Sequence, residues 1–161
     1  MKSETEMQLE RAQDDEERAF VLAFDAFTRA VRRARGMQPR SDAHALTLSQ
    51  YGLLEGLATR EMARVAELAD EAGITASTAT RILDALERRG IVARQRASED
   101  RRAVAVTLTD TGRELLLAQQ EWVSERKRQF LAELGEPERA YVPELMRALA
   151  RLIDELAAGP E

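Results

Sequence analysis

The spacing of apolar residues changes along this chain from a helical period to strict alternation and back. The first regular pattern is a stripe of apolar residues at intervals of four, three and four: Phe20, Phe24, Phe27 and Val31. This spacing places them on one side of a helix, which we expect to end at Gly36 and Pro39. Residues 1–18 are polar and acidic and lack an apolar face, so we expect the helix to begin after them and the first few residues to be frayed.

A second helix is predicted to start after Thr47. Thr47 and Gln50 have the spacing of a capping box, and Leu46 and Tyr51 stand at the positions of a hydrophobic staple. We expect this helix to bury one apolar face, formed by Tyr51, Leu54 and Ala58.

Two more short helices follow. The first is predicted over 64–72 and ends at a turn made by Gly73. Thr75 can cap the second, over 76–89, and Gly90 stands where a helix commonly ends in a left-handed residue.

The pattern then becomes alternating. Residues 91–97 and 103–108 have the character of strands, and the polar segment 98–102 (SEDRR) suits a hairpin loop. In the second strand every other residue is large and apolar, which predicts one buried face: Val104, Val106 and Leu108.

A helical period returns in the last third of the chain. Thr109 can cap a long helix over 110–134, and Gly135 stops it. Pro137 suits the first turn of a last helix over 137–157. The apolar seam of that helix consists of Tyr141, Leu145, Leu149, Leu152 and Leu156.

These elements predict a mainly α-helical fold with a small β-hairpin wing (α+β). Helix, strand, basic loop and strand in this order are the layout of a winged helix-turn-helix, flanked by terminal helices. We expect three segments: an N-terminal tail and dimerisation helix (1–45), a winged-helix DNA-binding domain (46–112) and C-terminal dimerisation helices (113–161). The small central unit cannot cover the apolar stripes of the terminal helices. We therefore expect a homodimer, with an intramolecular helical bundle as the alternative.

Composition narrows the chemistry. The chain of 161 residues has no Cys and one His, which excludes disulfides and thiolate sites and disfavours a histidine-rich metal centre. We expect no metal and no cofactor. No apolar run is long enough for a membrane span or a signal peptide, so we expect a cytoplasmic protein without a membrane partner. No catalytic motif stands out, so we expect no enzyme.

The net charge of −5 is unevenly distributed. Residues 74–113 hold eight Arg and five acidic residues, a net charge of +3, while the rest of the chain has a net charge of −8. Duplex DNA attracts such local basic charge, whereas the acidic remainder suppresses non-specific binding.

The helix over 76–89 has two distinct sides. Its outward side carries small hydroxyl residues and arginines, which can bond base edges and phosphates in a major groove: Ser77, Thr78, Thr80, Arg81 and Arg88. Asp84 faces the same way and can pair with Arg81 or Arg88. A solvated helix surface is the alternative interpretation.

The wing adds further arginines. Arg94 and Arg96 share one face of the first strand, and Arg101 and Arg102 stand at the tip. A narrow minor groove attracts arginine, although charged tips also block edge pairing. Asp100 suits a role as the partner that fixes an arginine's direction.

Three stretches closely resemble the multiple-antibiotic-resistance-regulator (MarR) family: LTLSQYGLLEGLA, RVAELADEAGITASTATRILDALERRGIVAR and SEDRRAVAVTLTDTGREL. The resemblance covers residues 46–115. It implies a homodimer, mostly a repressor, that releases operator DNA when a small, often aromatic and anionic, ligand binds. It also implies that Arg102 enters the minor groove with Asp100 as its partner, and that Arg101 meets a phosphate.

Together these features predict a sequence-specific transcriptional regulator that binds a pseudo-palindromic operator as a homodimer. The alternative is a winged-helix module that binds proteins and not DNA, which the net acidity favours. Candidates for an effector site are Phe24, Phe27, His44 and Tyr51. The phenylalanines also suit a dimer core, and His44 also suits an exposed or locally bonded position.

Overall fold

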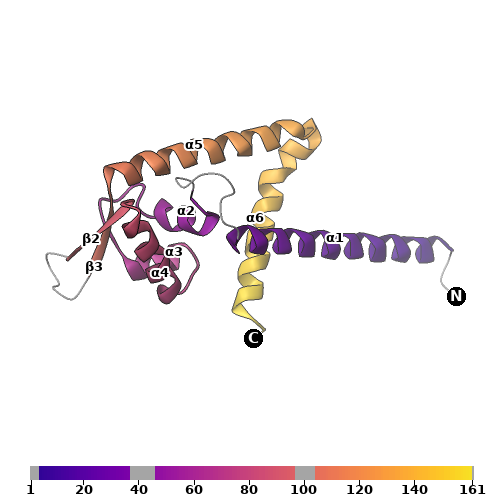
Figure 1. Ribbon diagram of the computed structural model, residues 1–161. Helices are drawn as coiled ribbons and strands as arrows, with labels where there is room; N and C mark the ends of the chain where they lie inside the picture. The colour runs from indigo at the N-terminus through magenta and orange to yellow at the C-terminus, as the bar shows by residue number, and fades with distance from the viewer. Residues whose placement is uncertain (1–3, 37–45, 97–103, 161) are drawn as a thin grey trace. The chain divides into compact units, whose positions relative to one another are not determined.

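The computed structural model describes residues 4–36, 46–96 and 104–160 (Figure 1). Contacts divide the chain into two compact units, Met1–Leu116 and Leu117–Glu161. The predicted fold class is confirmed, because helices dominate and the only regular β structure in the described ranges is a small antiparallel sheet. The elements in chain order are α1 (Glu4–Gly36), α2 (Leu48–Glu55), β1 (Ala63–Arg64), α3 (Val65–Glu71), α4 (Ala76–Arg88), β2 (Val92–Arg96), β3 (Val104–Leu108), α5 (Asp110–Glu133) and α6 (Glu136–Ala158). The assignment of 1–45, 46–112 and 113–161 to separate tasks stays a prediction.

Helix α1 begins much earlier than its apolar stripe predicts. It starts at Glu4, and its described side chains from Glu10 to Val21 are all exposed. The expectation that the helix begins after residue 18 is therefore wrong. Its first half is rich in Glu, Gln, Ala and Arg, which have high intrinsic helix propensity and need no buried face to favour a helix.

The predicted caps of the central helices are confirmed. The Thr47 side chain accepts from the Gln50 backbone N–H at 3.1 Å, and the Gln50 side chain accepts from the Thr47 backbone N–H at 3.0 Å. Thr75 caps α4 by accepting from the Thr78 N–H at 3.2 Å. Gly73 and Gly90 both have positive φ, which suits glycine at the turns that end α3 and α4.

The sheet has one more strand than predicted. The two-residue strand β1 pairs with β3 on the side opposite β2, giving the order β1-β3-β2. Strand β3 is therefore central, and both Ala105 and Val106 are buried. The expectation of one buried face on β3 is confirmed at Val106, but Leu108 is only half-buried and Ala105, on the opposite face, is buried as well.

The hydrophobic core lies between Leu46 and Leu116 and is built by α2, α3, α4 and the sheet. The buried positions of the second helix differ from those predicted, since Leu53 of α2 is also fully buried, while Ala58 lies beyond the end of α2 and is exposed. The fully buried large side chains are Leu53, Leu54, Leu57, Leu68, Leu83, Leu86, Val92 and Val106.

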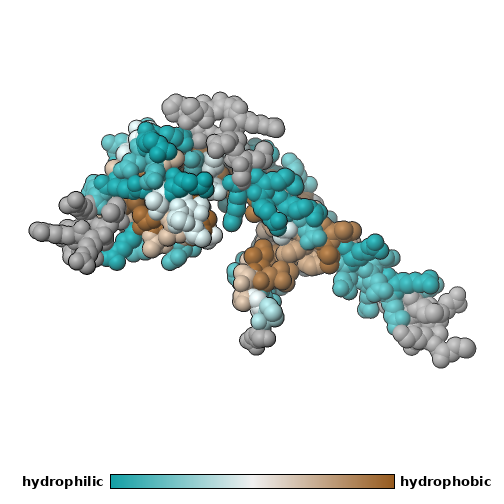
Figure 2. All heavy atoms as spheres, turned by 60° about the horizontal axis from the view of Figure 1, so that its bottom comes forward, coloured by the Kyte–Doolittle hydropathy of each residue, from teal (hydrophilic) through white to brown (hydrophobic). Residues whose placement is uncertain are grey.

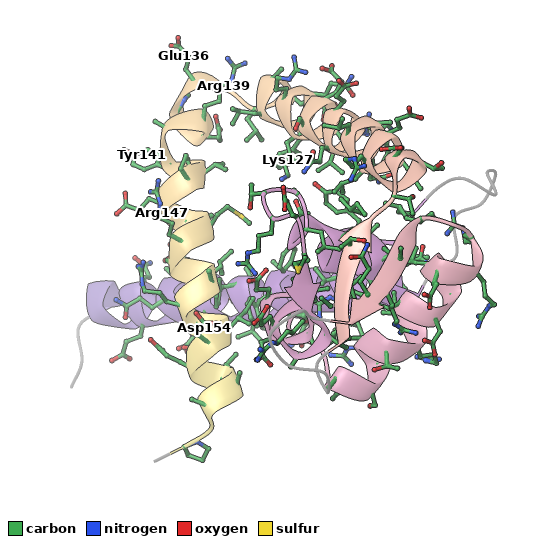
Figure 3. The ribbon with its side chains drawn as sticks, turned by 90° about the vertical axis from the view of Figure 1, so that its left-hand side faces the viewer. Lys127, Glu136, Arg139, Tyr141, Arg147 and Asp154 are labelled. Carbon is green, nitrogen blue, oxygen red and sulfur yellow. The ribbon has the colours of Figure 1, made fainter. Side chains whose placement is uncertain are left out.

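The terminal helices expose much apolar surface. No side chain of α6 is buried, and Tyr141 projects from it into open space (Figure 3). Figure 2 shows hydrophobic residues, coloured brown, at the surface. The large exposed apolar residues of α1, α5 and α6 include Phe20, Val21, Leu22, Phe27, Leu117, Trp122, Phe130, Leu131, Tyr141, Leu145, Met146, Ile153 and Leu156. Within the described ranges, no helix is both long and apolar enough to cross a bilayer.

Candidate nucleic-acid interface

Helix α4 is buried in the core on one side and exposed to solvent on the other. Its inner side is fully buried at Ala79, Leu83 and Leu86. Of the residues predicted to face outward, Ser77, Thr80, Arg81 and Arg88 are exposed, and Thr78 is half-buried. A rigid core therefore holds a polar, hydroxyl- and arginine-bearing helix face towards solvent.

Hydroxyl groups cluster at the start of α4. The Thr75 oxygen lies 3.0 Å from the Ser77 hydroxyl and 2.9 Å from the Thr78 hydroxyl. One turn later, the Thr80 hydroxyl donates to the Ala76 carbonyl at 2.9 Å. This bond uses the Thr80 proton, so its oxygen remains available to accept a bond from a base amino group.

Arg81 and Arg88 carry the free positive charge of this face. Within the described ranges, neither guanidinium has a hydrogen bond or an ion pair. The expected pairing of Asp84 with Arg81 or Arg88 is wrong, because Asp84 binds Arg94 of β2 instead. Both arginines on the outer face of α4 therefore keep their donors for an external anion.

Arg94 links the hairpin to α4. Its Nη1 lies 2.5 Å from Asp84 Oδ1 and 3.1 Å from Glu87 Oε2, and its Nη2 donates to the Thr80 carbonyl at 3.4 Å. The Arg94 side chain is 25% exposed, less than either carboxylate. Val92, on the same face of β2, is buried, so this face of the strand packs against the helix.

The hairpin extends beyond Arg94 towards the loop. Arg96 pairs in register with Val104 at the end of the described ladder. The loop candidates Asp100, Arg101 and Arg102 lie outside the described residues.

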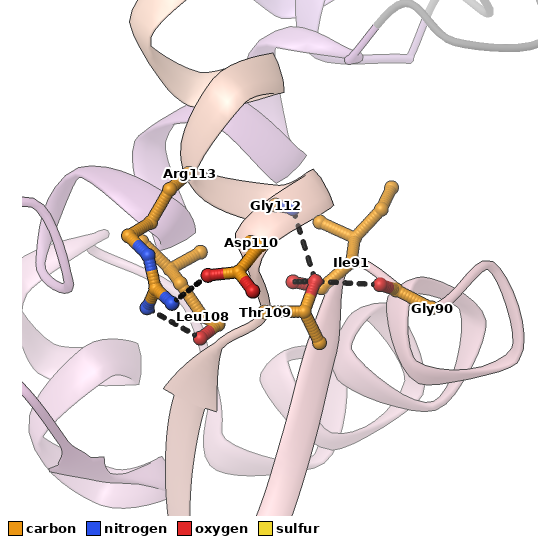
Figure 4. Close-up of polar contacts among 7 residues, drawn as sticks. All are labelled: Gly90, Ile91, Leu108, Thr109, Asp110, Gly112 and Arg113. Carbon is orange, nitrogen blue, oxygen red and sulfur yellow. Dashed lines mark hydrogen bonds and ion pairs between the residues drawn. The ribbon is translucent and has the colours of Figure 1, made fainter.

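The turn after α4 is tied to the start of α5 (Figure 4). The Thr109 hydroxyl donates to the Gly90 carbonyl at 2.6 Å and accepts from the Gly112 N–H at 3.0 Å. The Thr109 backbone N–H donates to the Ile91 carbonyl at 3.1 Å. The predicted cap of α5 is thus confirmed, and the same residue also holds the exit of α4.

The effector candidates are not brought together by any contact among the described residues. Phe24 stacks with Phe20 at a centroid distance of 5.9 Å, and Phe27 is exposed. The Ser49 hydroxyl of α2 donates to the Arg35 carbonyl of α1. Arg35 is about 12 Å from Phe27 along the axis of α1, so this contact between the two helices is far from the phenylalanine. His44 lies outside the described residues.

Tyr51 is a core residue of the central unit. It is 8% exposed. Burial, and then the hydrogen bond and negative charge of Glu55, raise the pKa of Tyr51 from 10.0 to about 12. The phenol is therefore held in its neutral form.

The triad of Asp84, Glu87 and Arg94 was not predicted as a unit from the sequence. The sequence does contain a signal for it. Two acidic residues stand three positions apart, which places them on one side of the helix, and the strand directly after the helix carries an arginine. Helix-local pairing was the simpler expectation, and the return of the chain through β2 supplies a partner ten residues away. Among the described residues, no group of three or more His, Asp or Glu could hold a metal ion.

Comparison with known proteins agrees with this geometry. The model of the MarR family matches residues 46–104. The helix-turn-helix transcriptional regulator YkoM of Bacillus subtilis is 30% identical over 111 residues, which are 68% of this chain and 71% of YkoM.

Two solved structures share the fold. The PcaV transcriptional regulator of Streptomyces coelicolor, in complex with its natural ligand, is 26% identical, with a TM-score of 0.57 over 66% of this chain and 75% of PcaV. Streptococcus pneumoniae FabT, in complex with DNA, is 19% identical, with a TM-score of 0.64 over 90% of this chain and 99% of FabT. The chain belongs to the MarR family of transcriptional regulators.

Proposed function

We propose that two copies of this chain bind a pseudo-palindromic DNA operator through α4 and the β2–β3 hairpin, and repress transcription. The observation that carries the proposal is the outer side of α4, where Arg81 and Arg88 have no partner within the described ranges while the inner side is fully buried. A rigidly held helix with free arginine and hydroxyl groups is suited to a major groove.

The arginine and hydroxyl side chains of α4 have different roles in this proposal. Arg81 grips a guanine through two donors, and Arg88 binds a phosphate farther along the helix. The hydroxyls of Ser77, Thr78 and Thr80 bond base edges or phosphates.

The hairpin forms the second part of the proposed interface. Arg96 lies on the strand that leads to the loop and binds the DNA backbone. At the tip, Arg102 enters the minor groove with Asp100 as its partner, while Arg101 meets a phosphate. The roles proposed for these three loop residues are supported by the sequence pattern.

The proposed homodimer rests on the exposed apolar side chains of the terminal helices. Trp122 and Phe130 of α5 and Leu145 and Leu156 of α6 are all more than half exposed in the single chain. A second copy would remove this surface from water. Two-fold symmetry would also place two α4 helices in successive major grooves, about 34 Å apart.

We further propose that a small aromatic or anionic effector releases the operator. The support is the likeness to PcaV, which has been solved with its natural ligand. Phe24, Phe27, His44 and Tyr51 are the candidate contacts. The effector acts by favouring a spacing of the two α4 helices that no longer fits DNA, to the extent of its differential affinity for the two states. A thermal-shift screen of aromatic acids tests for such a ligand, which would raise the melting temperature by mass action.

Fluorescence anisotropy with DNA from upstream of the chain's own gene tests the proposed function. We expect saturable binding, and the logarithm of the association constant should fall linearly with the logarithm of the salt concentration. A protein-binding winged-helix module, the competing function, predicts no such salt-dependent DNA binding. The same DNA with scrambled sequence is the control, and equal affinity for both would contradict sequence-specific recognition.

A further inference from the structure

We propose that Arg94 is a positioning residue that hides two acidic side chains of α4 from the phosphates of bound DNA. The inference rests on the proposed function, because it concerns how α4 approaches DNA. Asp84 and Glu87 would otherwise place two negative charges on the helix that must approach a polyanion. The Arg94 side chain reaches from β2 to α4 and contacts both carboxylates.

The geometry commits the Arg94 guanidinium to α4. Its Nη1 lies within ion-pair distance of both carboxylates, and its Nη2 bonds the Thr80 carbonyl. An arginine that gripped a phosphate with these nitrogens would have to break the contacts to α4. Arg94 therefore differs from Arg81 and Arg88, which have no partner within the described ranges.

The same contacts fix the hairpin on the helix. The carboxylates stand three residues apart on one side of α4, and a single guanidinium from β2 holds both. The bond to the Thr80 carbonyl adds a third anchor, on the backbone of a residue whose side chain belongs to the outer face. Arg94 thus sets the position of the wing relative to α4 and neutralises part of the negative charge at their junction.

A mutant cycle separates this role from direct contact with DNA. The four proteins are the wild type, Arg94→Ala, the pair Asp84→Asn with Glu87→Gln, and the triple variant. Their affinities for one operator are measured by anisotropy at several salt concentrations, below the melting temperature of the least stable protein. The cycle of Arg128→Ala and Glu125→Gln, an exposed ion pair on α5, is the matched control.

If Arg94 hides the two carboxylates from DNA, the effects of the substitutions on operator affinity are strongly non-additive. Arg94→Ala weakens binding about tenfold, because it exposes two carboxylates to the phosphates. Neutralising the acids changes affinity little in the wild type but recovers the loss in the Arg94→Ala background. The triple variant also keeps the wild-type salt slope, since no phosphate contact has been lost. The control cycle shows no coupling.

Two results would overturn the inference. The first is an equal effect of acid neutralisation in both backgrounds, which indicates independent charges. The second is a salt slope that falls by about one when Arg94 is removed and does not return in the triple variant, which indicates a direct phosphate contact. Failure of the wild type to bind any DNA would instead refute the proposed function, so the two failures are distinguishable.

Discussion

Gly112 lies so close to Ile91 that a Cβ at position 112 would stand 2.0 Å from the Ile91 carbonyl oxygen. This approach brings the first turn of α5 against the turn that ends α4. Thr109 bonds the carbonyls of Gly90 and Ile91 at the same place (Figure 4). The start of the long helix and the exit of the proposed DNA-reading helix are therefore locked together through backbone groups.

Replacing Gly112 should destabilise this junction. Gly112→Ala forces backbone to move, and we expect a loss of about 1–3 kcal/mol in the free energy of unfolding. Urea unfolding followed by circular dichroism measures it. The matched control is Gly52→Ala in α2, where a Cβ meets nothing within 4 Å and helix propensity predicts a gain of up to about 1 kcal/mol. Equal urea midpoints for Gly112→Ala and the wild type would refute the close approach.

Tyr51 should titrate well above a free phenol. Its pKa is raised to about 12, so the folded state binds the proton more tightly than the unfolded state. The resulting stability is fully present below pH 10 and is lost as the pH rises from 10 to 12. In a Tyr141→Phe variant Tyr51 is the one remaining tyrosine, and its phenolate absorbance reports the pKa. A midpoint near 10 in the folded protein would contradict the buried position.

The apolar seam of α6 should be needed for dimer formation. Leu145 is 54% exposed in the single chain. Leu145→Glu removes the burial of two leucines from a two-fold interface, at about 2 kcal/mol each, so the dimer should weaken about a thousandfold. Sedimentation equilibrium measures the dissociation constant, with Glu144→Gln as the neighbouring exposed control. A monomeric wild type, or an unchanged constant for Leu145→Glu, would rule out this interface.

Features determined by local chemistry were predicted correctly from the sequence. The capping box of Thr47 and Gln50, the caps at Thr75 and Thr109, and the turn glycine Gly90 depend on residues a few positions apart. Their spacing alone contains the information. The pattern of α4 likewise predicted four of its exposed residues: Ser77, Thr80, Arg81 and Arg88.

Features that depend on chain return were missed. Strand β1 has only two residues and is a strand only because it pairs with β3, more than 40 residues later in the chain. The partner of Asp84 is Arg94, which reaches it only after the chain reverses at Gly90. The polar start of α1 was missed for another reason, because periodicity detects buried faces and not intrinsic helix propensity.

The affinity of Arg81→Ala for the operator tests the central claim most directly. The account predicts a loss of about 1–3 kcal/mol in binding free energy and a relaxed base preference at the contacted position. Arg128→Ala, which removes the same charge from α5, should bind like the wild type apart from a small non-specific loss. If Arg81→Ala binds the operator with wild-type affinity and preference, α4 is not the DNA-reading surface.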